Sequence, residues 1–119
     1  MIISKQNSTH YQWGNHCDAW TLLQSENVII KEEKMPPNTE EQFHYHNETA
    51  QFFYVLDGKA SFYIANDIIY VSKNEGINIP VKVVHKISNE TSADLRFLVI
   101  SFPGNSDDRV NSDKKQSKV

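Results

Sequence analysis

The sequence predicts an all-β protein, built as an antiparallel barrel or sandwich. Short runs of β-branched and aromatic residues recur along the 119-residue chain at nearly even spacing, and turn residues separate them. None of these runs keeps the 3.6-residue period of an amphipathic helix. A chain of this length accommodates one domain around a single hydrophobic core.

Nine segments are expected to form strands. Asp57-Gly58 predicts a tight hairpin between two aromatic strands, and Asn66-Asp67 predicts a second hairpin. Pro36-Pro37-Asn38 and the stretch 73–76 mark two further turns. The expected strands, in chain order, are 21–24, 28–35, 42–46, 50–56, 60–65, 67–72, 76–79, 83–88 and 95–102.

The composition changes near the C-terminus. After Pro103 the only large apolar side chains are those of Val110 and Val119. A segment with so little apolar area to bury is expected to remain disordered. The sequence therefore predicts one barrel domain over residues 1–103, followed by a disordered tail over residues 104–119.

Charge and hydropathy exclude several classes of partner. Twelve basic and fifteen acidic residues give a net charge of −3, and no basic block precedes the last residues, so nucleic acid is not an expected partner. The apolar runs are too short to span a membrane, and Met1-Ile2-Ile3 is followed by polar residues instead of the hydrophobic core of a signal peptide. The lone Cys17 cannot form an internal disulfide. We therefore expect a cytoplasmic protein.

The stretch QFHYHNETAQFF, residues 42–53, carries polar side chains inside an aromatic strand. Side chains two positions apart in a strand share a face, so His44 and His46 project together, while Phe43 and Tyr45 take the other face. Two neutral imidazoles on one buried face need partners, and a shared metal ion is one such partner. The pair alone is equally compatible with surface or hydrogen-bonded histidines.

The surrounding residues give the histidine pair a context, because their spacing over residues 36–102 resembles the two sequence motifs of the cupin family. Cupins are small antiparallel β-barrels of the jelly-roll type, also described as double-stranded β-helices, that hold a metal ion near one end of the barrel. Gln51 stands where the family usually has a glutamate ligand. Six residues match the motifs in identity and spacing: His44, His46, Gly58, Pro80, His85 and Asn89.

Three positions depart from the glycines of the two motifs. Asn38 and Asn74 stand for the opening glycines, and Lys82 stands for the internal glycine of the second motif. Those glycines serve turns, where a positive φ is common. Asparagine tolerates that conformation well, whereas lysine is the larger change.

The resemblance implies one divalent transition metal held by His44, His46, Gln51 and His85. An amide ligand in place of a carboxylate leaves the charge of such an ion at +2, which favours an electrophilic site. Nitrogen-rich ligation favours Fe, Ni, Mn, Co or Zn over Ca or Mg. Four protein ligands would also leave positions for a small-molecule ligand. Gln51 could alternatively act only by hydrogen bonding to a histidine.

The expected hairpin register indicates which side chains face the ion. A two-residue turn at Asp57-Gly58 would pair Gln51 with Ile64 on one face. Aromatic residues on the other face, such as Phe52 and Tyr54, need a cover, and cupins are commonly dimers, so the resemblance implies a homodimer. The predicted pocket lining is Phe53, Val55, Phe62, Ile64, Ile69 and Val71.

Candidates for proton transfer are few. Glu48 lies in the loop between His46 and Gln51, at the expected barrel mouth, and is the candidate catalytic base. Other polar or aromatic residues could reach the mouth only if the terminal strands pack against it: Trp13, Asp18 and Arg96.

Three functions are compatible with these residues. The first is a metal-dependent isomerase or lyase that acts on a small oxygenated molecule, such as a sugar or keto acid, by Lewis-acid catalysis. The second is a non-haem metal oxygenase, and the third is a module that binds or senses a small ligand without turnover. A carboxylate close to the ion would favour the first, and an apolar pocket without a base would favour the others.

Overall fold

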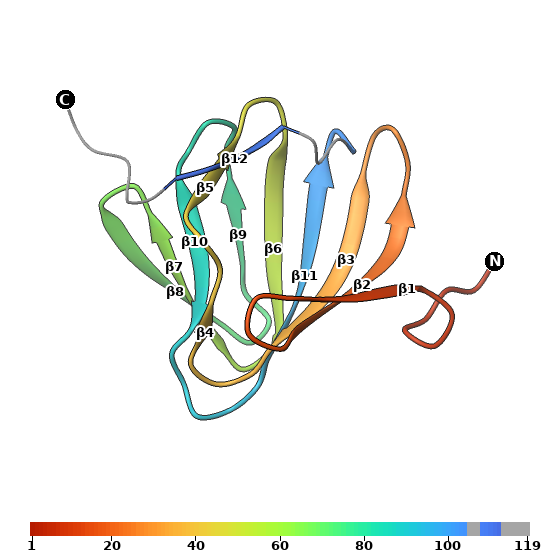
Figure 1. Ribbon diagram of the computed structural model, residues 1–119, viewed down its shortest axis with the longest axis horizontal. Coiled ribbons are helices and arrows are strands. Elements are labelled where there is room, and N and C mark those ends of the chain that lie inside the picture. Colours follow the sequence, from red (N-terminus) through yellow and green to blue (C-terminus); the bar gives the residue numbers. More distant parts are fainter. Residues whose placement is uncertain (105–107, 113–119) are drawn as a thin grey trace.

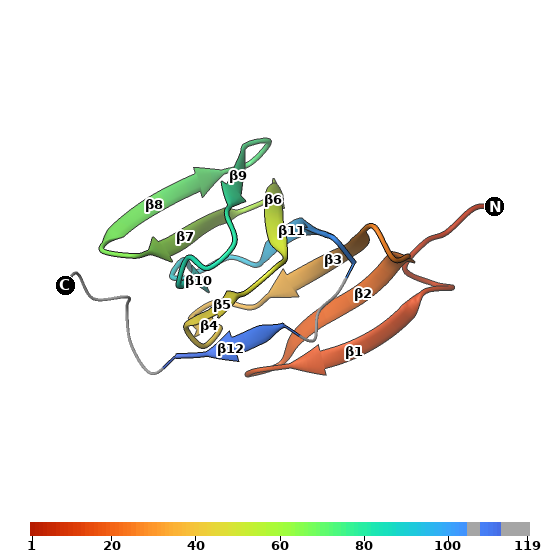
Figure 2. The same cartoon turned by 90° about the horizontal axis from the view of Figure 1, so that it is seen from above.

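The computed structural model describes residues 1–104 and 108–112, and these residues form two antiparallel sheets (Figures 1 and 2). The predicted all-β fold is confirmed. The described residues contain no helix long and apolar enough to cross a membrane.

The two sheets have six and five strands on their main paths. In spatial order the first is β1 (Thr9–Trp13), β2 (Cys17–Gln24), β3 (Ile29–Met35), β11 (Leu95–Phe102), β6 (Ala50–Asp57) and β9 (Gly76–Ile79). The second is β12 (Arg109–Asn111), β5 (His44–His46), β10 (His85–Asn89), β7 (Lys59–Ile64) and β8 (Asp67–Ser72), with β4 (Thr39–Glu40) also paired to β10. Each of the nine expected segments overlaps one of these strands.

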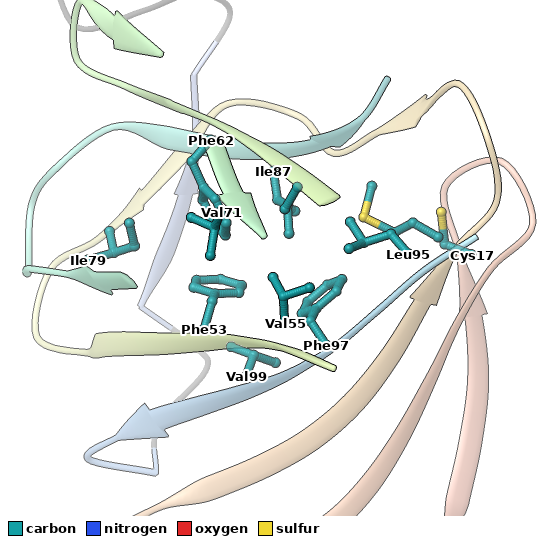
Figure 3. Close-up of a cluster of buried hydrophobic side chains, with 12 residues drawn as sticks. Cys17, Phe53, Val55, Phe62, Val71, Ile79, Ile87, Leu95, Phe97 and Val99 are labelled. Atoms are coloured by element: carbon teal, nitrogen blue, oxygen red, sulfur yellow. The ribbon is translucent and has the colours of Figure 1, made fainter. Parts of the chain in front are cut away.

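The hydrophobic core fills the space between the two sheets (Figure 3). Strands of both sheets supply it, and in β6, β7 and β11 the core residues alternate with others because side chains along a strand point to opposite faces. The ring of Phe53 on β6 lies 5.0 Å from that of Phe62 on β7 and 5.8 Å from that of Phe97 on β11, measured between centroids. The contact with Phe62 joins the two sheets, and the contact with Phe97 lies within the first sheet.

The hairpin predicted at Asp57-Gly58 is wrong. Strand β6 pairs with β11 and β9, whereas β7 pairs with β10 and β8, so the chain crosses from one sheet to the other at this point. Gly58 has φ 87°, and a Cβ there would lie 2.6 Å from the backbone oxygen of Asp94. The glycine therefore permits a close passage of two backbone segments.

The hairpin between β7 and β8 does form, one residue earlier than expected. Ile64 pairs with Asp67, which leaves Ala65 and Asn66 in the loop, and Ala65 has φ 52°. The register thus shifts by two residues from the predicted one. A shift of two preserves the face of every side chain.

The three departures from the motif glycines keep a glycine-like backbone. Asn38, Asn74 and Lys82 have φ values of 60°, 67° and 65°. At Lys82 this conformation lets the backbone N–H donate to the carbonyl oxygen of His46 at 2.7 Å. The turns of the motifs are therefore retained at the expense of left-handed strain, which is greatest for the lysine.

Strand β12 lies within the tail that the sequence analysis expected to be disordered. It pairs antiparallel with β5, with Arg109 opposite His46, Val110 opposite Tyr45 and Asn111 opposite His44. For residues 108–112 the expectation of disorder is wrong, because the unpaired edge of β5 offers backbone hydrogen bonds that composition does not reveal. Residues 105–107 and 113–119 of that tail lie outside the described residues.

Candidate metal centre and cavity

A cavity of about 500 Å³ opens between the sheets. Apolar side chains line one part of it, including Phe53, Phe97 and Val99. The polar lining comes from strands of both sheets and from the segment before β5: Lys31, Glu33, Glu40, Glu41, Gln42, His44, His46, Gln51, Ser101 and Arg109.

Three histidines meet beside the cavity. His44 and His46 lie on β5 and His85 begins β10, opposite His44 in the register. The ring centroid of His44 lies 4.4 Å from that of His85 and 5.3 Å from that of His46. All three residues are almost fully buried, with exposed fractions of 2% to 6% of the whole residue.

The hydrogen bonds of the three imidazoles define their tautomers. Nδ1 of His44 contacts the carbonyl oxygen of Gln42 at 2.9 Å, and Nδ1 of His85 contacts that of Val83 at 2.9 Å. Nδ1 of His46 contacts the carboxylate of Asp108 at 2.8 Å. Carbonyl and carboxylate oxygens only accept, so each Nδ1 carries a proton, and in the neutral form of each ring Nε2 is the atom that presents a lone pair.

Burial keeps two of these imidazoles neutral. It lowers the pKa of His44 to about 3, and the neighbouring His85 and Arg109 act in the same direction. It lowers the pKa of His85 to about 4, against the hydrogen bond to Val83. Neutral imidazole is the form of histidine that binds a metal ion.

The free atoms of this group match a metal site. Nε2 of His46, Nε2 of His85 and Oε1 of Gln51 are buried and have no hydrogen-bond partner among the described residues. The amide of Gln51 is oriented by its Nε2, which donates to Oγ of Ser101 at 3.1 Å. Buried acceptors without partners are costly unless a ligand completes them, so these residues fit a bound cation.

Glu41 is a further candidate ligand, which the sequence analysis missed. In the described part of the chain, Glu41, His44 and His85 form a group whose possible ligand atoms all lie within 4.8 Å of one another. Oε1 of Glu41 lies 3.9 Å from Nδ1 of His44 and accepts the backbone N–H of Ile87 at 3.1 Å. The structure thus contains a possible His/His/Glu site.

Two carboxyl groups in the cavity have strongly raised pKa values. Burial raises the pKa of Glu33 to about 7, although Lys31 and Arg109 oppose the shift. Burial also raises the pKa of Glu41 to about 8, and the charge of Glu33 adds to that effect. Groups of this kind exchange protons near neutral pH, as general acid–base catalysis requires.

Asp108, the residue directly before β12, contacts the candidate metal centre through His46. Oδ1 of Asp108 accepts from Nδ1 of His46, while Oδ2 accepts the backbone N–H groups of Glu48 and Thr49 at 2.8 Å each. Burial alone would raise the pKa of Asp108, but these hydrogen bonds outweigh it and lower the pKa to about 2. Asp108 is therefore ionised beside His46.

The residues predicted to line the pocket lie in three different environments: the cavity, the hydrophobic core and the exposed surface. Phe53 lines the cavity. Val55, Phe62 and Val71 belong to the hydrophobic core, and Ile64 packs against that core. Ile69 pairs with Phe62 on the edge strand β8 and shares a face with the buried Val71, but it is 41% exposed.

The predicted base and the other proton-transfer candidates lie mostly outside the cavity. Glu48 is exposed and does not belong to the residues that line the cavity. Asp18 contacts His10, and Arg96 contacts Glu32. Trp13 does line the cavity.

Sequence signals could have identified some of the missed residues. Ile29 and Met35 are the buried ends of β3, so the alternation between them places Lys31 and Glu33 inward. Glu41 precedes His44 by three positions, close enough to reach the same site. No local pattern marks Asp108, because its partner His46 is 62 residues away.

Comparisons with known proteins agree with this architecture. A model of the Cupin domain matches residues 31–101. An uncharacterized protein of Methanocaldococcus jannaschii is 30% identical over 74 residues, which are 62% of this chain and 59% of that protein, so the match spans less than two thirds of the relative.

Solved structures share the fold at low sequence identity. A predicted oxalate decarboxylase from Thermotoga maritima superposes with a TM-score of 0.79 at 18% identity, covering 87% of this chain and 99% of that one. KdgF from Halomonas sp. superposes with a TM-score of 0.81 at 12% identity, covering 90% and 98%. Likeness at such identities shows a common fold and no common reaction.

Proposed function

Because the chain belongs to the cupin family, we propose that its cavity is a metal-dependent active site for a small oxygenated molecule, such as a sugar or keto acid. The reaction is of the isomerase or lyase type. A bound divalent transition metal, of the group Fe, Ni, Mn, Co and Zn, supplies Lewis-acid polarisation of a carbonyl or hydroxyl oxygen. The proposed ligands are His44, His46, Gln51 and His85.

The observation that carries the proposal is a set of buried polar atoms that have no hydrogen-bond partner in the described part of the chain. Among the described residues, Nε2 of His46, Nε2 of His85 and Oε1 of Gln51 are buried without a partner. His46 and Gln51 line the same cavity, and the ring centroid of His85 lies 6.4 Å from that of His46. The Nδ1 atoms of His46 and His85 already donate to oxygen acceptors, which leaves the two Nε2 atoms available for a cation. Glu41 is an alternative carboxylate ligand beside His44 and His85.

The carboxyl groups in the cavity favour proton-transfer chemistry over the oxygenase and binding alternatives. Glu33 and Glu41 both line the cavity and have pKa values of about 7 and about 8. Near neutral pH one of the pair holds a proton while the other accepts one. In this role Glu33 and Glu41 replace Glu48, which lies outside the cavity lining.

The walls of the cavity orient a small molecule. Phe53, Phe97 and Val99 supply apolar surface that excludes water, while Lys31 and Arg109 supply hydrogen-bond donors. Arg109 Nη1 lies 3.9 Å from Oε2 of Glu41, so a ligand oxygen that reaches this carboxylate also meets the guanidinium.

We also propose that the protein forms a homodimer through the outer face of the first sheet. Ile30, Ile100 and Phe52 lie side by side across β3, β11 and β6, and all three are only half-buried. Leu98 and Tyr54 extend the apolar row, and Phe52 stacks on Tyr54 with centroids 6.5 Å apart. A second copy would cover this surface.

Metal analysis combined with a proton-exchange assay tests the enzymatic proposal. Purified protein, loaded in turn with each of the five metals, is incubated in deuterated water with α-hydroxy carbonyl compounds and 2-keto acids. Deuterium should enter the carbon next to the carbonyl, and His46→Ala should abolish this exchange. Oxygen consumption without exchange would favour the oxygenase, and binding without either reaction would favour the sensor.

A further inference from the structure

The C-terminal segment 108–112, here called the clasp, contacts the candidate metal centre in a way that the metal ligands alone do not require. Three observations concern it: the pairing of β5, the carboxylate of Asp108, and the side chain that follows it. Figures 1 and 2 show the strand of the clasp, β12, beside β5.

Strand β5 carries two proposed ligands but is poorly supported within its sheet. On one side it pairs with β10 at a single position, His44 with His85. On the other side it pairs with β12 at three consecutive positions. Further bonds run from the N–H of Ser112 to the oxygen of Phe43 at 2.7 Å and from the N–H of Asn47 to the oxygen of Asp108 at 3.4 Å. The clasp therefore supplies most of the backbone pairing of β5.

The carboxylate of Asp108 holds one ligand in its binding tautomer. It accepts Nδ1–H of His46 and is itself held by two backbone N–H groups, those of Glu48 and Thr49. Both side chains of the pair are shielded, with exposed fractions of 7% for His46 and 8% for Asp108. A carboxylate with its remaining lone pairs occupied has little freedom to move, so the imidazole plane is fixed as well.

The next residue faces the cavity. Arg109 lines it beside Glu41, and its Nε donates to Oδ1 of Asn111 at 3.0 Å within the clasp. Two consecutive residues of the clasp therefore have different roles: Asp108 contacts His46 of the candidate metal centre, and Arg109 lines the cavity. Release of the clasp would remove the support of His46 and the guanidinium together.

We propose that the clasp pre-organises the metal centre: Asp108 is a positioning residue for His46, and metal binding and docking of the clasp stabilise each other. This inference rests on the proposed metal site. The coupling follows from linkage, since a ligand that binds only the docked form must stabilise that form. Metal should accordingly protect the clasp, and loss of the clasp should weaken metal binding.

The first test needs no metal. Long-range ¹H–¹⁵N NMR of the histidine rings reports which nitrogen carries the proton. In the wild-type protein His46 should be protonated at Nδ1, and in Asp108→Ala it should become a mixture of tautomers. Asp108→Asn should instead move the ring proton to Nε2, because its single amide oxygen is needed by the backbone N–H groups of Glu48 and Thr49 and its NH2 group then faces Nδ1. An unchanged His46 spectrum in Asp108→Ala would overturn the positioning role.

The second test measures binding of Ni²⁺ alone, with Zn²⁺ in parallel, by calorimetry. Asp108→Ala should weaken binding by about 10- to 100-fold. Val110→Pro keeps the carboxylate of Asp108 but removes a backbone N–H of the clasp. Val110 lies opposite Tyr45, and the alternation of hydrogen bonds in an antiparallel pair makes this N–H a donor to β5. This variant should therefore also weaken metal binding. Asp94→Asn, a remote surface carboxylate beside Lys34, is the matched control and should bind as the wild type does.

The third measurement is hydrogen exchange of the clasp in the wild-type protein. Metal should slow exchange of the amides of residues 108–112 and 43–47, with little change in β8. If Asp108→Ala and Val110→Pro both fold and bind Ni²⁺ and Zn²⁺ with wild-type affinity, the coupling is overturned while the metal site stands. If the wild type binds no metal, the metal site and the coupling both fail, and the NMR result still decides the role of Asp108.

Discussion

Oε1 of Glu41 lies 3.9 Å from Nδ1 of His44, so a carboxyl group and a neutral imidazole share one buried corner of the cavity. Burial shifts the two pKa values apart: it raises that of Glu41 to about 8 and lowers that of His44 to about 3. Both groups are therefore uncharged at neutral pH without a metal. At any pH at which the unfolded chain would ionise one of these groups, keeping that group neutral in the folded state lowers the free energy of unfolding.

Glu41→Gln should alter the pH dependence of stability in metal-free protein. Between the ordinary pKa of 4.5 and the folded pKa of about 8, the unfolded state has lost the proton that the folded state keeps. The Glu41 contribution therefore falls with rising pH, by at most about 1.4 kcal/mol per pH unit. The variant should lose this decline, as measured by urea unfolding from pH 5 to 8.5 with a chelator present.

Glu48→Gln is the control for that measurement, because Glu48 is exposed and outside the cavity. It should keep the wild-type pH profile and the wild-type deuterium exchange. A profile for Glu41→Gln that parallels the wild type would show that Glu41 ionises normally and is not buried in the folded protein.

Metal should raise the stability of the protein. At about 100 times its dissociation constant, the correct ion should add about 2.7 kcal/mol to the free energy of unfolding, since it binds only the folded state. His85→Ala should remove most of that gain. His10→Ala is the matched control, because His10 is 44% exposed and contacts Asp18 away from the cavity. A melting temperature that no divalent ion changes would contradict the metal site.

Gln51→Glu should tighten metal binding and reduce activity. A carboxylate lowers the effective charge of the bound ion, so affinity rises while polarisation of the substrate weakens. Metal content by mass spectrometry and the rate of deuterium exchange measure the two effects. Equal occupancy with equal activity would mean that Oε1 of Gln51 does not bind the ion.

Lys82→Gly should stabilise the fold by about 1 kcal/mol, because glycine adopts the observed φ of 65° without the steric cost that an L-residue bears there. The higher entropy of glycine in the unfolded state offsets part of this gain. Lys82→Ala keeps the strained conformation and is the matched control. Denaturant unfolding of both variants measures the difference, and equal stabilities would contradict the strain argument.

Ile100→Lys should convert a dimer into a monomer. Ile100 lies between Ile30 and Phe52 on the outer face of the first sheet, and a charge there cannot be buried against a second copy. Analytical ultracentrifugation gives the mass in solution. Ile68→Lys, on the exposed strand β8 of the other sheet, should leave the mass unchanged. A monomeric wild type would exclude the homodimer.

Local chemistry accounts for what the sequence could predict. The period-two alternation placed Phe53, Val55, Phe62 and Val71 inward correctly, even though the predicted hairpin pairing was wrong. Alternation is a property of each strand alone, and an error of two residues in register does not change it. The same reasoning explains why His44 and His46 share a face.

Tertiary structure decided which strands are neighbours, and with them the residues that complete the site. Gly58 is compatible with either a hairpin or a crossing between sheets, and only the nearby backbone of Asp94 distinguishes the two. The pKa values of Glu33 and Glu41 are raised because the fold buries both carboxyl groups. That burial depends on residues far apart in the sequence.

The sequence by itself determined the all-β class, the strand segments and the spacing of the candidate ligands, because each depends on neighbours a few residues away. Only the tertiary structure decided that Asp108 meets His46 and that the polar segment after Pro103 supplies a strand. Composition identifies a segment that cannot form a core of its own. It does not show that an edge strand elsewhere lacks a partner, since backbone hydrogen bonds are available to any sequence.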